Sequence, residues 1–345
     1  MTARRWLFPL LVPLSWLFFA AIIMRRWLYR AGFLRSIHLG PRTISIGNIE
    51  AGGTGKSPFV SGLVASLVQE GHRPVVLARG YKSGLPRGAF ACYMNASLVP
   101  DSSGSLDARA RADEARMISA QNPTVPVIIG ADRVAAWNAF SRTIEGYRPT
   151  HVILDDGFQH LRIRRDVDVV LVSEGFRGDR LLPAGNLREP LSALGRADFV
   201  IRTTGRDGAV VPVVPERARD MLGGIPVLPA RVVYGPLVQA GSAVDADFMR
   251  SNPLPRQIVV ACGIARPASF VRAVESIGMK PRRLVIAGDH QRFQPSQFSK
   301  DAIDGADAIV TTAKDYWRDP EIILSAGIPV WILPMTIEFP YRNLF

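Results

Sequence analysis

Residues 43–60, TISIGNIEAGGTGKSPFV, combine an extended segment, a glycine-rich turn and a helix start. The β-branched run at residues 43–46 predicts a short strand. After the turn, apolar residues recur at helical spacing, and Pro58 stands in a first helical turn, where its missing N–H is tolerated. This order is typical of a P-loop, in which backbone N–H groups and a helix dipole hold a phosphate chain.

The residues of the turn suit that chemistry, although their spacing departs from the usual motif. Lys56 is placed to reach the outer phosphates, and the Ser57 hydroxyl is placed to ligate Mg²⁺. The usual spacing has a glycine at position 50, where this chain has glutamate. We therefore expect a variant P-loop whose nucleotide-binding residues are Glu50, Ala51, Gly52, Gly53, Thr54, Gly55, Lys56 and Ser57. The simpler alternative is a glycine-rich turn with a solvated lysine.

Composition indicates a folded chain with an anionic partner. The chain has 345 residues, enough for two α/β domains or one large one, and its net charge is +12. Such a charge suits nucleic acid, a phosphorylated substrate or an acidic membrane. No zinc spacing, recognition helix or aromatic RNA-binding signature is evident, so we expect no nucleic-acid partner. Cys92 and Cys262 form neither a metal motif nor a disulfide framework, which indicates a reducing compartment.

The N-terminal segment is apolar enough to associate with a membrane. Residues 6–24, WLFPLLVPLSWLFFAAIIM, carry no charge, and arginines flank them on both sides. We favour a span or membrane-inserted anchor, with the P-loop side in the cytoplasm. A helix lying in the interface, or docked in a groove of the protein itself, is the second interpretation. A cleaved signal peptide is the third, and no small-residue cleavage site supports it.

Acidic residues follow or begin several predicted elements. Residues 151–154 predict a strand that runs into Asp155 and Asp156, where P-loop proteins place the carboxylate that holds Mg²⁺. The alternative is an ordinary Asp-Gly turn. Asp113 and Glu114 open a predicted helix, and acids in a first turn commonly compensate the helix dipole. Residues 85–106 show no clear period.

The alternation of strands and helices predicts an α/β fold, a P-loop-type, doubly wound, mostly parallel sheet with a second, smaller α/β domain and an N-terminal membrane-associating helix. We expect the apolar segment at 1–34, the nucleotide-binding domain at 35–230 and the smaller domain at 231–345. The last residues are candidates to return to the first domain.

Several polar residues at predicted strand ends have two interpretations each. Arg79 is either a ligand contact or part of a solvated loop. Arg188 either holds a phosphate or pairs with its neighbour Glu189. His290 beside an aspartate is either a structural hydrogen-bonding group or an acid–base group. Lys314 either frames a nucleotide base or lies on the surface.

Taken together, the motifs resemble the tetraacyldisaccharide 4′-kinase family, the lipid A 4′-kinases of Gram-negative bacteria. The matching segments follow the family's order along nearly the whole chain: GNIEAGGTGKSP from Gly47, ARGYKS from Ala78, the Asp113-Glu114 pair, ILDDGFQH from Ile153, LLPAGNLREPL from Leu181, GIARPASF from Gly263, GDHQRF from Gly288 and TTAKD from Thr311. Asn186 stands where the family pattern has proline, and Ala313 where it more usually has an acid.

The resemblance implies a kinase that moves the γ-phosphate of ATP to the 4′-hydroxyl of a tetraacylated glucosamine disaccharide 1-phosphate. It implies ATP and Mg²⁺ as cofactors, Lys56 at the β- and γ-phosphates, and Asp113 as general base with His290 as its partner. It also implies a metal site formed by Ser57, Glu114, Asp155 and Asp156. The lipid substrate and the anionic inner leaflet would be the partners, at the cytoplasmic face of the bacterial inner membrane. A membrane-tethered P-loop switch ATPase or GTPase is the alternative that the same loop allows.

Overall fold

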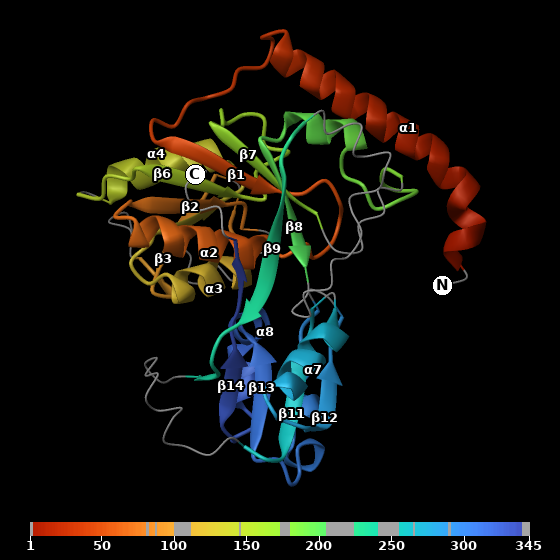
Figure 1. The fold of residues 1–345 in the computed structure, drawn as a ribbon, viewed down its shortest axis with the longest axis vertical. Helices are drawn as coiled ribbons and strands as arrows, with labels where there is room; N and C mark the ends of the chain where they lie inside the picture. The colour runs from red at the N-terminus through yellow and green to blue at the C-terminus, as the bar shows by residue number, and fades with distance from the viewer. Residues whose placement is uncertain are drawn as a thin grey trace.

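The computed structural model of the chain describes residues 3–80, 83–86, 88–99, 112–144, 146–172, 180–204, 224–240, 255–264, 266–288 and 291–339. These residues form a ten-stranded sheet, a five-stranded sheet and a long N-terminal helix, α1 (Ala3–Arg30). Figure 1 shows the two sheets one above the other, with α1 lying across the outer end of the larger unit.

The ten-stranded sheet has the order β15-β9-β8-β7-β1-β6-β2-β5-β3-β4. Its run from β9 to β5 is parallel, β15 and β3 pair with the two ends of that run in antiparallel orientation, and β4 pairs antiparallel with β3. The strands are β1 (Arg42–Gly47), β2 (Pro74–Ala78), β3 (Phe90–Met94), β4 (Ser97–Leu98), β5 (Val127–Gly130), β6 (His151–Asp155), β7 (Val167–Val172), β8 (Phe199–Thr204), β9 (Val227–Tyr234) and β15 (Met335–Glu338).

Helices cover both faces of this sheet, which confirms the doubly wound fold. Ile44 and Ile46 of β1 pack in one cluster with Phe59 of α2 (Lys56–Gln69) and with apolar residues of α3 (Asp113–Gln121). On the opposite face, strand residues pack against Trp137 and Phe140 of α4 (Arg133–Thr143), and further along against the short helix η1 (Leu191–Arg196). The central strands are apolar on both sides because both faces are covered.

The five-stranded sheet has the order β10-β14-β13-β11-β12 and is parallel except for β10. Helix α7 (Pro267–Ser276) packs on one face through Phe270 and Val274, and the remaining helices contribute Phe298 and Ile323 to the other. The other elements are β10 (Val238–Gln239), β11 (Ile258–Cys262), β12 (Pro281–Ile286), β13 (Ala308–Thr312), β14 (Val330–Leu333), α8 (Ala313–Arg318), α9 (Pro320–Leu324), η2 (Pro295–Phe298) and η3 (Lys300–Ala302).

Two antiparallel strands connect the sheets. β9 runs along the edge of the larger sheet towards the smaller unit, and β15 returns beside it, with Met335 opposite Tyr234 (Figure 1). The expected boundary at residues 230 and 231 lies inside β9. We therefore propose that the smaller domain begins after Tyr234 and that residues 335–338 belong to the larger one.

Helix α1 is continuous through Pro9 and Pro13, although prolines weaken a helix interior. Its Leu11–Arg30 span is long and apolar enough to cross a membrane, and 6% of that span is buried. Ser15 is buried, whereas Trp16 and Leu17 are 72% and 68% exposed. The helix therefore has an inner face against the protein and an apolar outer face that the described chain leaves uncovered.

Candidate active site

The P-loop lies where β1 gives way to α2, at the carboxyl edge of the larger sheet. Gly55 precedes the helix in a left-handed conformation with φ of 82°, which a residue with a side chain rarely adopts. Residues 52–58 line a cavity of about 1550 Å³. Open α/β sheets bind ligands at this edge, beside the point where the strand order reverses, and β1 occupies that point.

Glu50 and Ala51 lie just before the cavity lining and pair with another loop. The Ala51 N–H donates to the Asn186 carbonyl at 2.6 Å, and Glu50 forms an isolated antiparallel bridge with Leu187. Glu50 is 5% exposed. Their backbone contacts fix the entry to the P-loop, and their predicted contact with the nucleotide stays a prediction.

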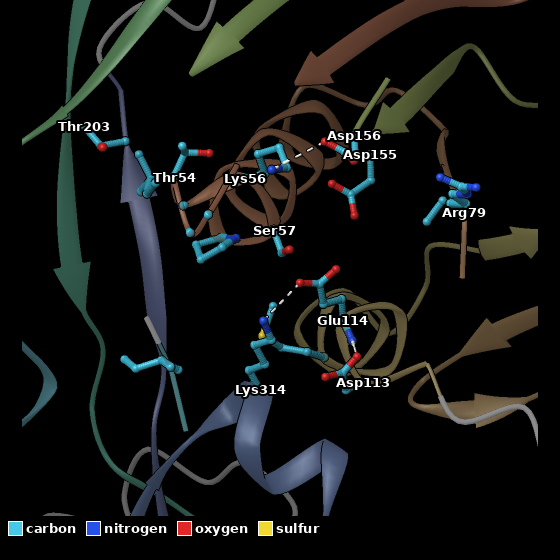
Figure 2. A pocket seen from close by; sticks show the side chains of 18 of the residues that line it. Thr54, Lys56, Ser57, Arg79, Asp113, Glu114, Asp155, Asp156, Thr203 and Lys314 are labelled. Atoms are coloured by element: carbon cyan, nitrogen blue, oxygen red, sulfur yellow. Dashed lines mark hydrogen bonds and ion pairs between the residues drawn. The ribbon is translucent and has the colours of Figure 1, made fainter. Parts of the chain in front are cut away.

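Lys56 points towards the acids that end β6. Its Nζ lies 3.4 Å from Asp156 Oδ1 (Figure 2). Arg188 Nη1 lies 3.0 Å from Asp156 Oδ2. Burial would raise the pKa of Asp156, but Lys56 and Arg188 outweigh that effect and hold the pKa below its ordinary value. Asp156 is therefore a carboxylate between two cations. Arg188 contacts this acid, while Glu189 pairs with Arg196 at 3.0 Å.

Asp155 has the opposite electrostatic environment. Burial, reinforced by Glu114 and Asp156, raises its pKa to about 7, although Lys56 and Arg133 act in the other direction. Its Oδ1 atom has no hydrogen-bond partner among the described residues. A buried carboxyl oxygen without a donor is costly unless a cation or a proton occupies that position.

Arg133 holds the backbone of the two acids in place, a role that was not predicted from the sequence. This first residue of α4 is 3% exposed, and its guanidinium donates to the carbonyl oxygens of Asp155 at 2.7 Å and Asp156 at 3.2 Å. Burial lowers the pKa of Arg133, with Asp155 and Asp156 opposing the effect. The one local signal was a charged residue amid the apolar pattern that follows Asp132.

Asp113 and Glu114 stand in the first turn of α3 and both line the cavity; Glu114 points towards Ser57 of the P-loop, and Asp113 lies beyond it (Figure 2). The Glu114 N–H donates to Asp113 Oδ1 at 2.9 Å, and both acids lie in the first turn, where they compensate the helix dipole. Glu114 Oε1 also lies 3.3 Å from Lys314 Nζ of α8. Lys314 thus reaches the cavity rather than the outer surface. His290 lies outside the described residues, and its pairing with Asp113 stays a prediction.

The predicted metal ligands fit a magnesium ion. Ser57, Glu114, Asp155 and Asp156 all line the cavity, and Asp155 presents the unpaired buried oxygen. Within the described ranges, no three His, Cys, Asp or Glu side chains form a ready cluster. A magnesium site does not need such a cluster, because Mg²⁺ usually binds one or two carboxylates and completes its coordination shell with water and substrate phosphates.

The cavity extends well beyond the P-loop. Phe18 and Ile22 of α1 line one wall, and α7 and α8 of the smaller unit line another. Its volume exceeds the roughly 300–1,000 Å³ typical of a single small-molecule site. Arg79 and Thr203 also face it, as Figure 2 shows, so the ligand-contact interpretation of Arg79 is the one its position supports. The space suits a nucleotide and a second, larger ligand.

Comparison with known proteins assigns the family. The model of the tetraacyldisaccharide-1-P 4′-kinase family matches residues 7–344. The tetraacyldisaccharide 4′-kinase of Syntrophotalea carbinolica is 33% identical over 97% of this chain and 89% of the relative. That of Chlorobaculum tepidum is 30% identical over 96% and 93%. LpxK from Aquifex aeolicus, crystallised in complex with ATP, superposes with a TM-score of 0.75 and 26% identity over 99% of this chain and 96% of that one. The chain therefore belongs to the tetraacyldisaccharide-1-P 4′-kinase family.

Proposed function

We propose that this protein transfers the γ-phosphate of ATP to the 4′-hydroxyl of a tetraacylated glucosamine disaccharide 1-phosphate. One observation carries the proposal. The P-loop cation Lys56, the acids Asp155 and Asp156 and the Asp113-Glu114 turn all face a single cavity that α1 also lines. A nucleotide site and an apolar helix are therefore neighbours, as phosphorylation of a lipid requires.

The nucleotide would lie along the P-loop with its phosphates at the start of α2. Backbone N–H groups of residues 52–57 and the α2 dipole would bind the phosphate oxygens, and Lys56 would reach the outer ones. The ion pair with Asp156, at 3.4 Å, holds the Lys56 ammonium in the cavity. Arg188, on the other side of Asp156, is a second cation for the transferring group. Phosphoryl transfer depends mainly on such positioning and charge stabilisation.

The acceptor hydroxyl needs a base, and Asp113 is the residue that we assign to this role. It opens α3 at the cavity wall, so its carboxylate can accept the proton as the oxygen attacks phosphorus. Ser57, Glu114, Asp155 and Asp156 would hold Mg²⁺, which when bound neutralises charge on the phosphates. Lys314, whose Nζ lies 3.3 Å from Glu114 Oε1, would hold the Glu114 carboxylate at this position.

We also propose that α1 lies along the membrane surface at the cytoplasmic face of the inner membrane. Its inner face contacts the protein through Ser15, and its outer face exposes Trp16, Leu17 and Met24. A helix that is docked along one side and apolar on the other suits an interfacial position. The arginines beside it would attract anionic headgroups of that leaflet. A lipid substrate would then enter from the side of the cavity that α1 forms.

A phosphate-transfer assay tests the function. Protein in detergent receives Mg²⁺, γ-labelled ATP and tetraacyldisaccharide 1-phosphate, and labelled lipid is measured. We compare wild type with Asp113→Ala and with Asp113→Asn, whose amide oxygen can still accept from Glu114. Loss of a general base predicts a fall in kcat of roughly 10²–10⁴ for both variants, with unchanged affinity for MgATP.

Two outcomes would oppose the proposal. Turnover of ATP without labelled lipid in wild type would favour the switch ATPase, or a different acceptor. Full activity of Asp113→Asn would limit Asp113 to capping α3. Lys56→Ala is the reference for a broken nucleotide site, because it should lose both transfer and hydrolysis.

A further inference from the structure

Ser15 is a buried polar residue on a helix whose neighbouring side chains are apolar and exposed. It is 6% exposed, whereas Leu14 and Trp16 beside it are 50% and 72% exposed. Its Oγ lies 3.0 Å from the Leu181 carbonyl and accepts from the Ala184 N–H at 3.1 Å. A serine hydroxyl in a helix can donate to the carbonyl four residues earlier, and the Leu11 carbonyl lies 3.1 Å from Ser15 Oγ. That bond would be enough to satisfy the hydroxyl. The bonds to residues 181 and 184 therefore need another explanation.

The segment that Ser15 contacts is a tight loop, residues 180–189, which we call the 180–189 loop. The Leu182 N–H donates to the Leu187 carbonyl at 2.8 Å, and the Leu187 N–H donates to the Arg180 carbonyl at 2.9 Å. A Cβ atom at Gly185 would collide with the backbone of Arg180. These contacts make the loop a compact unit.

The far side of the same unit forms part of the phosphate site. The Arg188 N–H donates to the Ile49 carbonyl at 2.7 Å, and the Asn186 carbonyl accepts from Ala51 at 2.6 Å. The Arg188 guanidinium then contacts Asp156 at 3.0 Å, and Asp156 contacts Lys56. One rigid loop thus touches α1 at one end, and the entry to the P-loop and its paired acid at the other.

We propose that Ser15 is a positioning residue that couples the docking of α1 to the geometry of the phosphate site through the 180–189 loop. Without its hydroxyl, the Ala184 N–H loses its acceptor against an apolar helix, which is a costly arrangement. The loop relaxes to find another partner, and Arg188 and the Ala51 contact move with it. Phosphate-site geometry in this protein therefore depends on the N-terminal helix being docked.

The proposal rests on the proposed kinase reaction for its kinetic test, and a second measurement is independent of that reaction. Full-length Ser15→Ala, Ser15→Thr and Ser141→Ala are compared with wild type in detergent. Ser141 is the matched control, because it is an exposed helical serine whose Oγ bonds within its own helix, to the Asn138 carbonyl at 3.0 Å. The measurements are kcat and KM for ATP and lipid, and hydrogen exchange across residues 180–189 and 133–143.

Loss of one buried hydrogen bond predicts that Ser15→Ala lowers kcat about tenfold, with the lipid KM changed less than about twofold. Its exchange should accelerate in residues 180–189 and not in residues 133–143. Ser15→Thr should restore both readouts, and Ser141→Ala should behave as wild type. An effect confined to the lipid KM would assign Ser15 to substrate capture and overturn the proposal. Wild-type exchange in the 180–189 loop of Ser15→Ala would overturn it as well.

A double-mutant cycle tests the route of the coupling. If Ser15 acts through Arg188, Ser15→Ala should have little further effect on kcat in an Arg188→Gln background, and additive effects would contradict the route. Hydrogen exchange separates this inference from the kinase assignment. If wild type transferred no phosphate to the lipid, the proposed function would fail while the exchange difference would still decide the role of Ser15.

Discussion

Asp155 and Asp156 are adjacent carboxylates in opposite environments. Burial raises the pKa of Asp155 to about 7, whereas Lys56 and Arg188 overcome the effect of burial at Asp156 and lower its pKa. In the turn after β6, Asp156 adopts φ of 53°, in the left-handed region that residues with side chains rarely occupy. Two neighbouring acids whose pKa values are shifted in opposite directions at one strand end are typical of a functional site.

The first prediction concerns stability and pH in magnesium-free buffer. The folded protein holds the Asp155 proton more tightly than the unfolded chain, because the pKa rises from 3.8 to about 7. This contribution to stability is fully present below pH 3.8 and is lost as the pH rises through 7. Asp155→Asn, which mimics the neutral acid, should therefore melt above wild type at pH 8, with the difference shrinking towards pH 5. Thermal unfolding by circular dichroism measures it.

Asp156→Asn is the matched control, because the pKa shift of Asp156 has the opposite sign to that of Asp155. A lowered pKa contributes stability that is present above the ordinary value and is lost as the pH falls through the folded value. This variant should melt below wild type at neutral pH, since Lys56 and Arg188 lose their shared carboxylate. Parallel melting curves for the two variants would contradict the assigned environments.

The elements that carry the phosphate site were predictable because their signals are local. The strand at residues 43–46, the glycine turn and the helix start lie in one continuous stretch, and β6 with its terminal acids follows the same logic. β3 (Phe90–Met94) escaped prediction as part of the unassigned residues 85–106, since it pairs in antiparallel orientation with the distant β5. Arg133 and Ser15 escaped for a related reason, and Lys314 was left with two interpretations. Their roles come from contacts between segments that are far apart in sequence.

The packing of α3 against α8 is one such long-range contact, and it carries the second prediction. The Arg116 guanidinium stacks 4.8 Å from the Trp317 ring centre, one turn along the helix that begins with Asp113. Cation–π contacts contribute about 0.5–2 kcal/mol, so Arg116→Ala should lower kcat by roughly twofold to thirtyfold as α3 shifts. Steady-state kinetics with the lipid substrate measures it.

Two variants show whether that effect comes from the contact itself. Arg116→Lys keeps the charge but loses the planar stacking group, so it should recover only part of the rate. Arg142→Ala removes an exposed arginine from the last turn of α4 and should leave kcat unchanged. If Arg142→Ala slowed the enzyme as much as Arg116→Ala, loss of net charge rather than the α3–α8 contact would be the cause.

Three parts of the molecule line the cavity: the P-loop end of the larger sheet, the smaller unit and one face of α1. Most of the large apolar side chains exposed in the described chain lie between Leu14 and Ile37. One segment therefore supplies both a wall of the site and a surface for a bilayer. Substitutions on one face of α1 should therefore change membrane binding without changing catalysis, because the exposed side chains and the cavity-lining side chains lie on different faces of the helix.

The last prediction separates these faces with two variants. Trp16→Gln combined with Leu17→Gln changes only the outer face, where the side chains are 72% and 68% exposed. It should weaken flotation with anionic vesicles and leave MgATP affinity, measured by calorimetry, at the wild-type value. Deletion of residues 1–26 also removes Ser15, Phe18 and Ile22, so it should release the protein from vesicles and also lower kcat in detergent. A deletion variant that still floats would place the main membrane contact after residue 26, where Phe33 and Leu34 are 71% and 40% exposed, and α1 would then serve chiefly as a wall of the active site.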